Sequence, residues 1–137
     1  MSKIILSSIF LMITLTGCQT LSISLPESEY QGNLPPQIKN EIAKSVNDTE
    51  IEGMRGATAK VYFDSEKSLM TIAYMLRNPH WQWTIYKSDV EKDSFPYLCE
   101  KYGYEINNGL GIRYWFSGSG GFTTDTVTKE VCNSLSS

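Results

Sequence analysis

Apolar and polar residues follow three different patterns along the first 133 residues of the 137-residue chain. Residues 1–17 consist mainly of an apolar run, whereas residues 18–35 are polar, contain prolines and show no sustained apolar period. Residues 36–133 show the spacings of amphipathic helices and half-buried strands. We therefore expect a leader at 1–17, a flexible tether at 18–35, one folded domain at 36–133 and a flexible tail at 134–137.

The folded region is expected to open with a helix at Pro36, because proline in the first turn costs no intrahelical hydrogen bond. Four apolar residues then fall on one helical face: Ile38, Ile42, Ala43 and Val46. Asn47 and Asp48 are expected to end the helix. We predict that the apolar face packs against a sheet.

Three strands are predicted next. Residues 57–63 alternate between apolar and polar, which indicates a half-buried strand, and residues 64–68 form a polar hairpin loop. Residues 69–76 are apolar on both faces, which predicts a strand that is central or covered on both sides. After a turn at Asn78, residues 81–86 alternate again and are predicted as a third strand.

The next segment is helical in composition but contains Pro96. We expect a short helix with Ser94 as its N-cap, Pro96 in its first turn and Gly103 as its C-terminal stop. Cys99 would lie on that helix.

Two more strands complete the expected fold. Residues 111–117 form the first, with Ile112, Tyr114 and Phe116 on one face, and residues 122–131 form the second and bring Cys132 to its end. The order of elements predicts an α+β fold. Its four- to five-stranded, mostly antiparallel sheet would carry the N-terminal helix and the short helix, with one disulfide.

Catalytic and metal-binding patterns are not evident. The only histidine, His80, leaves a triad or a multi-histidine site short of members, and Ser119 lacks the G-x-S-x-G spacing. Asp89, Glu91 and Asp93 are interpreted as a solvated acidic segment rather than a calcium loop. We therefore expect no enzymatic activity and no metal site. A net charge of −3 without a basic run disfavours nucleic acid as a partner.

Binding of another protein is the better prospect, because the chain holds eight Tyr and three Trp. A short sheet cannot bury every aromatic ring, so we expect an apolar groove between sheet and helix. Its predicted lining is Trp81, Trp83, Ile112, Tyr114 and Phe116. The alternative is that these side chains form the core.

The leader resembles a bacterial lipoprotein signal. Lys3 precedes an apolar run of about a dozen residues, too short to span a ~30 Å hydrocarbon core, and Leu15-Thr16-Gly17-Cys18 resembles a lipobox. The resemblance implies cleavage before Cys18 and covalent lipid on its thiol, with no other cofactor. Gln19 rather than Asp follows, which implies the periplasmic face of the outer membrane. The alternative is an ordinary secreted protein.

If Cys18 carries lipid, Cys99 and Cys132 remain as a pair. An exported domain with two thiols favours a disulfide, worth about 3–4 kcal/mol in the chain-entropy model. A two-cysteine metal site is the alternative, although neither cysteine lies in a C-x-x-C arrangement.

The C-terminal region resembles the small α/β pilotin lipoproteins of type II secretion systems. The resemblance rests on the lipobox, on Cys99 and Cys132, and on the motif Gly111-Ile112-Arg113-Tyr114 at the start of a strand. It implies that the protein binds the C-terminal helix of a secretin subunit. It also implies a membrane attachment through lipid and use of the lipoprotein sorting machinery to deliver the subunit to the outer membrane.

Two other functions remain open on the same residues. One is a lipoprotein binding module of another kind, such as an inhibitor of a cell-wall hydrolase or an accessory subunit of an envelope complex. The other is a structural lipoprotein without a specific ligand.

Overall fold

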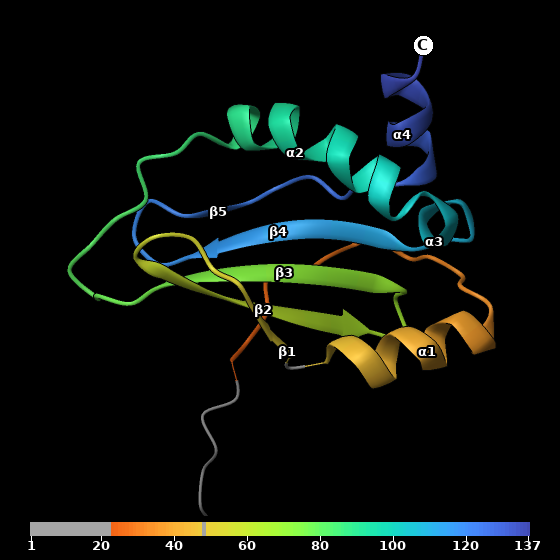
Figure 1. Ribbon diagram of the computed structural model, residues 1–137, viewed down its shortest axis with the longest axis horizontal. Coiled ribbons are helices and arrows are strands. Elements are labelled where there is room, and N and C mark those ends of the chain that lie inside the picture. The colour runs from red at the N-terminus through yellow and green to blue at the C-terminus, as the bar shows by residue number, and fades with distance from the viewer. Residues whose placement is uncertain (1–22, 48) are drawn as a thin grey trace, which may run out of the picture.

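A computed structural model describes residues 23–47 and 49–137 (Figure 1). The elements occur in the order α1 Pro36–Val46, β1 Thr49–Ile51, β2 Ala57–Asp64, β3 Leu69–Leu76, α2 Lys87–Lys101, α3 Gly103–Asn107, β4 Gly111–Ser117, β5 Phe122–Thr123 and α4 Lys129–Leu135. The strands form one five-stranded sheet in the order β1-β2-β3-β4-β5. The predicted α+β class is confirmed.

The sheet is mixed and mostly antiparallel. All neighbouring strands pair antiparallel except β3 and β4, which run parallel. A parallel pair needs a long crossover, and α2 and α3 supply it. Leu69–Leu76 is therefore central, as its two apolar faces predicted.

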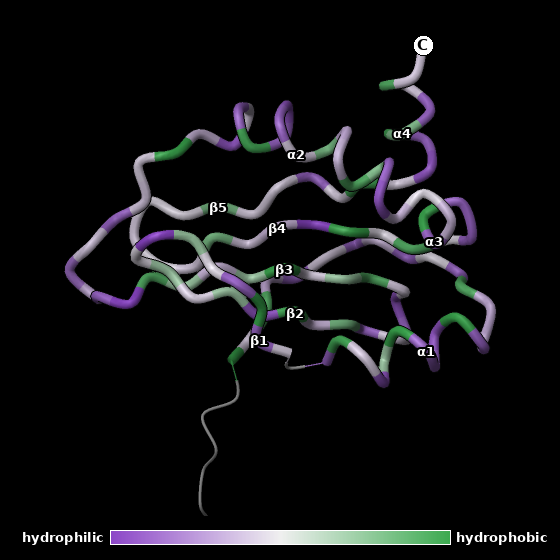
Figure 2. Tube along the Cα trace, viewed as in Figure 1, coloured by the Kyte–Doolittle hydropathy of each residue, from purple (hydrophilic) through white to green (hydrophobic). Residues whose placement is uncertain are grey.

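One face of the sheet forms the core with the helices. In β2 every second residue is buried, as the alternation predicted, and Val61 faces the core beside Ile72 of β3 and Tyr114 of β4. Helices α2 and α3 add Phe95 and Ile106. Hydrophobic residues recur along the strands, whereas hydrophilic residues make up much of α2 (Figure 2).

Helix α1 begins at Pro36, as predicted. Ile42 is buried, and the other three apolar residues of its predicted face pack against the core: Ile38, Ala43 and Val46. Asn47 ends the helix, and its side-chain oxygen accepts a hydrogen bond of 2.8 Å from the backbone N–H of Phe63. This bond fixes the end of α1 to β2.

The predicted strand at residues 81–86 is wrong. This segment forms no helix or strand and leads into α2. Trp83 nevertheless contacts the β4–β5 turn, since its backbone N–H donates to Ser119 O at 2.9 Å and its Nε1 donates to Ser117 O at 2.9 Å. The alternation of apolar and polar residues in this segment therefore comes from single side chains, such as Trp83, that attach it to the domain, and not from a strand. The place beside β3 is taken by β4.

The helix predicted from Ser94 begins earlier, at Lys87, so Ser94 is not its N-cap. Pro96 lies inside the helix on its exposed side, where water can satisfy the backbone carbonyl that loses its partner. The helix ends at Lys101. Gly103 is not a stop, because it begins α3.

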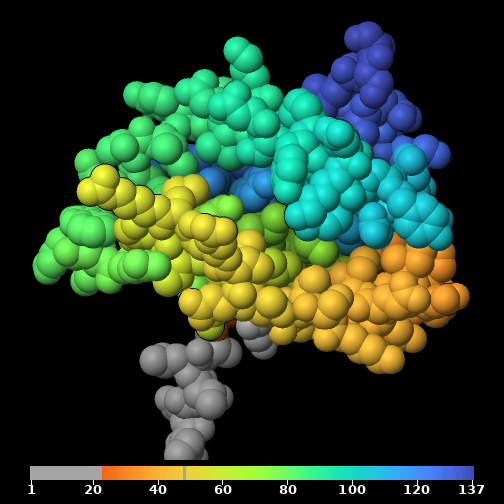
Figure 3. All heavy atoms as spheres, in the orientation of Figure 1, coloured from red at the N-terminus to blue at the C-terminus, as the bar shows by residue number. Residues whose placement is uncertain are grey.

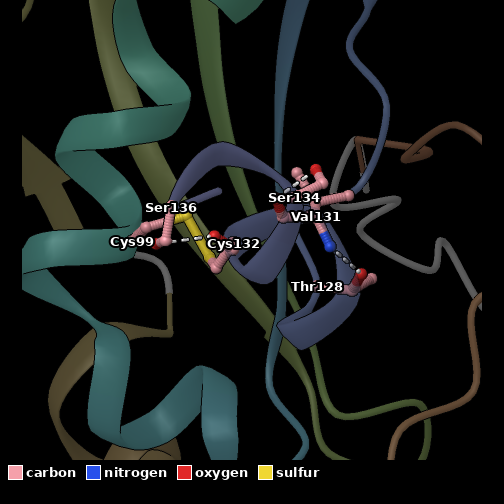
Figure 4. Close-up of a disulfide and its surroundings, with 6 residues drawn as sticks. All are labelled: Cys99, Thr128, Val131, Cys132, Ser134 and Ser136. Atoms are coloured by element: carbon pink, nitrogen blue, oxygen red, sulfur yellow. Dashed lines mark hydrogen bonds between the residues drawn. A yellow bond between two sulfur atoms is a disulfide. The ribbon is translucent and has the colours of Figure 1, made fainter.

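The long last strand is also wrong. Only Phe122–Thr123 forms β5, and Val127 adds an isolated bridge to Ile112. The chain then enters α4, because the Thr128 hydroxyl accepts a hydrogen bond from the backbone N–H of Val131 and caps the helix (Figure 4). The helix includes Leu135, so the tail predicted from residue 134 is partly helical.

The predicted disulfide between Cys99 and Cys132 is confirmed. The bond joins α2 to α4, with 5.6 Å between the two Cα atoms (Figure 4). Cys132 therefore reaches its partner from a helix rather than from a strand.

Part of the predicted tether is not a flexible linker. Residues 23–35, which we call the strap, lie across the sheet face opposite α1 and α2, and Figure 1 shows them in orange behind the strands. Leu34 is 2% exposed, and its backbone N–H donates to the Ser68 hydroxyl at 3.1 Å. Leu34 packs in the core, whereas Ile23 at the other end of the strap is 44% exposed. The few apolar residues of the strap therefore leave no period in the sequence.

Candidate functional site

A groove opens between α2 and the helical face of the sheet. Figure 3 shows it as a hollow between α2 in green and the segment around β1 in yellow, with β4 in blue at its floor. Its volume is about 540 Å³. Its lining comprises Met54, Tyr74, Thr84, Ile85, Tyr86, Asp89, Val90, Asp93, Ser94, Tyr114 and Phe116.

The floor of the groove is aromatic. Tyr74 of β3 stacks on Phe116 of β4, with 5.2 Å between ring centroids, and on Tyr114 at 6.1 Å. These contacts follow from the parallel register, which places Tyr74 opposite Phe116. Ala59 of β2 lies on the other side of Tyr74. This small side chain leaves the ring room.

One wall of the groove is a single face of α2 and the residues just before it. Val90 and Ser94 are one helical turn apart, and Tyr86 precedes Val90 by the same spacing. Ile85 adds apolar surface below them and packs against the core. The opposite side of the groove is formed by Met54, in the connection between β1 and β2.

The floor of the groove combines apolar rings with the hydroxyl groups of Tyr74 and Tyr114. Burial raises the pKa of Tyr114 to about 12, and a hydrogen bond with Ser94 acts in the opposite direction. Burial also raises the pKa of Tyr74. Both phenols therefore stay protonated at neutral pH and are able to donate a hydrogen bond.

The structure brings only part of the predicted lining to the groove. Tyr114 and Phe116 line it from within the core, where they are 8% and 3% exposed, and Ile112 is fully buried. Trp83 packs its ring edge against Phe116, with 5.0 Å between centroids, and is not among the lining residues. Trp81 is 50% exposed and lies beside a smaller hollow near Leu76.

The residues that the sequence interpretation missed come mainly from α2 and its approach. Tyr86, Val90 and Ser94 show a helical spacing, which would have placed them on one face had the helix been started at Lys87. Met54 offered no signal, because it lies in a short connection between strands.

The strap is held on the opposite face of the sheet by Arg113. Its side chain is 4% exposed and donates to the backbone oxygens of Pro26 at 2.6 Å and Glu27 at 3.1 Å, and to the Thr71 hydroxyl at 3.0 Å. Burial lowers the pKa of Arg113. A hollow of about 160 Å³ adjoins these contacts, and Lys67 contributes to its lining.

Tyr30 adds a second contact between the strap and the sheet. Its hydroxyl donates to Gly109 O at 2.8 Å, and its ring lies over Gly111. A Cβ at Gly111 would lie 2.5 Å from Tyr30 Cε1, so the motif that begins β4 needs glycine for this close approach.

Cys18 and the leader belong to the part of the chain that the structure does not describe. Within residues 23–47 and 49–137, no His, Cys, Asp and Glu side chains gather in a group that could hold a metal ion. No helix in the same ranges has the length and apolarity to cross a bilayer.

Comparison with known proteins gives no relative. No family model, no curated protein and no solved structure matches this chain.

Proposed function

We propose that the protein is an outer-membrane lipoprotein, anchored through Cys18, that binds the C-terminal helix of a secretin subunit and escorts it to the outer membrane. The groove between α2 and the sheet is the observation that carries the proposal. It is open to solvent, floored by aromatic rings and walled by one helical face (Figure 3).

The groove suits one face of a helix. An α-helix with its side chains is about 10–12 Å wide, and a bound amphipathic helix places its anchors at i, i+3, i+4 and i+7. A volume of about 540 Å³ accommodates a few apolar anchors rather than a whole helix. The client helix would therefore lie along α2, with its apolar side chains over Tyr74 and Phe116 and its other face in solvent.

The position of the strap indicates how the lipid anchor and the client would be arranged around the sheet. It lies on the sheet face opposite the groove, so the lipid anchor and the client would attach to opposite faces (Figure 1). Five peptide units separate Cys18 from Ile23, which limits their distance to about 18 Å. The domain would therefore stay close to the bilayer, with the groove accessible to the periplasm.

Calorimetry with synthetic peptides tests the binding. The protein would be residues 18–137 with Cys18→Ser, and the peptides would be the C-terminal helices of the secretins encoded in the same genome. We expect one peptide to bind with micromolar or tighter affinity. Failure of all cognate peptides to bind would contradict the proposal.

Two exposed tyrosines provide a matched pair of variants. Tyr86 lines the groove and is 72% exposed, whereas Tyr104 on α3 is 70% exposed and lies outside the groove. Tyr86→Ala should weaken peptide binding at least about five-fold, as expected for an aromatic anchor. Tyr104→Ala should leave the affinity unchanged, and equal losses in both would place the site elsewhere.

A further inference from the structure

The groove has an electrostatic character that its aromatic floor does not explain. Two carboxylates line it, those of Asp89 and Asp93, and no Lys or Arg belongs to the lining. Both aspartates are exposed and lie one helical turn apart on α2, along the wall formed by Val90 and Ser94. One edge of an apolar groove therefore carries two negative charges.

The basic residue at the start of α2 does not neutralise this edge. Lys87 forms ion pairs with Glu91 at 3.7 Å and with Asp125 at 2.8 Å. Positions 87 and 91 lie on the side of the helix roughly opposite positions 89 and 93, because successive residues advance by about 100°. The ion pairs found among the described residues of α2 thus lie away from the groove.

We propose that the occupant of the groove is a basic amphipathic helix, whose apolar stripe is flanked by lysine or arginine, and that Asp89 and Asp93 are its specificity determinants. The inference rests on the proposed function and adds the charge of the client. The two carboxylates are spaced about 6 Å along the axis of α2, a rise that matches two basic residues one turn apart on a helix lying alongside.

The same charges exclude acidic helices. The chain has a net charge of −3, and an acidic helix with an equally apolar stripe would meet both aspartates at the groove edge. Specificity of this kind arises as much from repulsion of the wrong partner as from attraction of the right one.

The test uses two designed peptides that share one leucine stripe. One peptide carries lysine at two flanking positions a turn apart, and the other carries glutamate there. Calorimetry with residues 18–137 carrying Cys18→Ser, at low salt, should show about ten-fold tighter binding of the lysine peptide, because each exposed charge pair contributes roughly two- to five-fold. The preference should shrink in 1 M salt, where the screening length is about 3 Å.

Charge-removing variants assign the preference to the groove. Asp93→Asn should reduce the preference for the lysine peptide by about two- to five-fold. Asp89→Asn should do the same, although Asp89 also lies in the first turn of α2, where a carboxylate stabilises the helix. Glu66→Gln is the matched control, since Glu66 is exposed on the β2–β3 turn and does not line the groove.

The outcomes separate this inference from the proposed function. Equal binding of both peptides, or a preference that survives Asp93→Asn and Asp89→Asn, would overturn the charge assignment while leaving a helix-binding groove in place. If neither designed peptide binds but a cognate secretin peptide does, the inference is overturned and the proposed function stands. A fourth outcome is that no secretin peptide binds, but the wild type prefers the lysine peptide over the glutamate peptide and the two Asn variants do not. The groove then takes a basic helix from another partner.

Discussion

Arg113 decides how the strap attaches to the sheet. Its guanidinium is buried between Thr71 and the backbone oxygens of Pro26 and Glu27, and those partners are neutral. A buried guanidinium is tolerated when its donors are satisfied, and its planar fork reaches three acceptors that a lysine could not reach together. One side chain thus fixes two consecutive strap residues.

Removal of this side chain should loosen the strap. We expect Arg113→Met to lower the free energy of unfolding by about 1–3 kcal/mol, because it leaves hydrogen-bond acceptors without a donor. Arg113→Lys should be intermediate. Urea denaturation measures the change, and limited proteolysis should show faster cleavage within residues 23–34. Lys60→Met, on the same sheet face, is the control and should change the stability by less than about 0.5 kcal/mol. Equal protease resistance of Arg113→Met and the wild type would contradict the prediction.

The limits of sequence interpretation at this scale are visible in Arg113 and Leu34. Both are buried among residues distant in the sequence: Arg113 donates to the backbone oxygen of residue 26, and Leu34 packs in the core while its N–H donates to Ser68. A single arginine in a strand and a single leucine before two prolines carry no period. The burial of Leu34 gave no signal for that reason, whereas the shared face of Ile112, Tyr114 and Phe116 was predicted because their strand alternates.

At the scale of elements, the regular periods were predictive and the connections were not. β2, β3 and β4 match their predicted residues closely, and α1 begins at the predicted proline. The start of α2 was predicted too late, at Ser94 instead of Lys87. The reason is Pro96, because proline normally begins a helix or ends one. The alternation of residues 81–86 was interpreted as a strand beside β3. The parallel pairing of β3 and β4 was consequently missed, and with it the α2 wall of the groove.

Helix α4 depends on the disulfide more than on packing. None of its seven residues is fully buried. Val131 and Cys132 are partly buried where they pack against the core. The bond closes a sequence separation of 33 residues, which stabilises the fold by about 3–4 kcal/mol in the chain-entropy model. A helix held mainly by one covalent bond should separate from the domain when that bond is cut.

Cys99→Ser with Cys132→Ser should therefore free α4 before it unfolds the sheet. Hydrogen exchange should become faster in residues 129–135 under native conditions, while the central strand β3 stays protected. The urea midpoint should fall as well. Since neither cysteine lines the groove, the surviving folded protein should bind the client peptide unchanged. Unaltered exchange in α4 would show that its noncovalent contacts suffice.

At the scale of the whole molecule, the sheet separates two kinds of contact. The helical face carries the groove, and the opposite face carries the strap that leads toward Cys18 (Figure 1). Under the proposed function, attachment and binding are then independent. The lipid would set the location of the domain, and the groove would select the client.

Exchange of the leader tests this independence. One version keeps residues 1–18, and the other joins a conventional cleavable export signal to Gln19. The native version should incorporate palmitate and fractionate with outer membranes, whereas the exchanged version should be soluble in the periplasm, because stable anchoring needs the lipid. Cys18→Ala alone should leave a precursor whose mass still includes residues 1–17.

The exchanged version should still bind its client peptide with the native affinity in calorimetry, since the groove lies on the face opposite the strap. In cells it should nevertheless fail to deliver the secretin, which would then stay in the inner-membrane fraction. Sedimentation of both versions with outer membranes would show that the domain attaches to the membrane without the lipid. Normal secretin delivery by the soluble version would show that binding alone, without the anchor at Cys18, is enough to move the client.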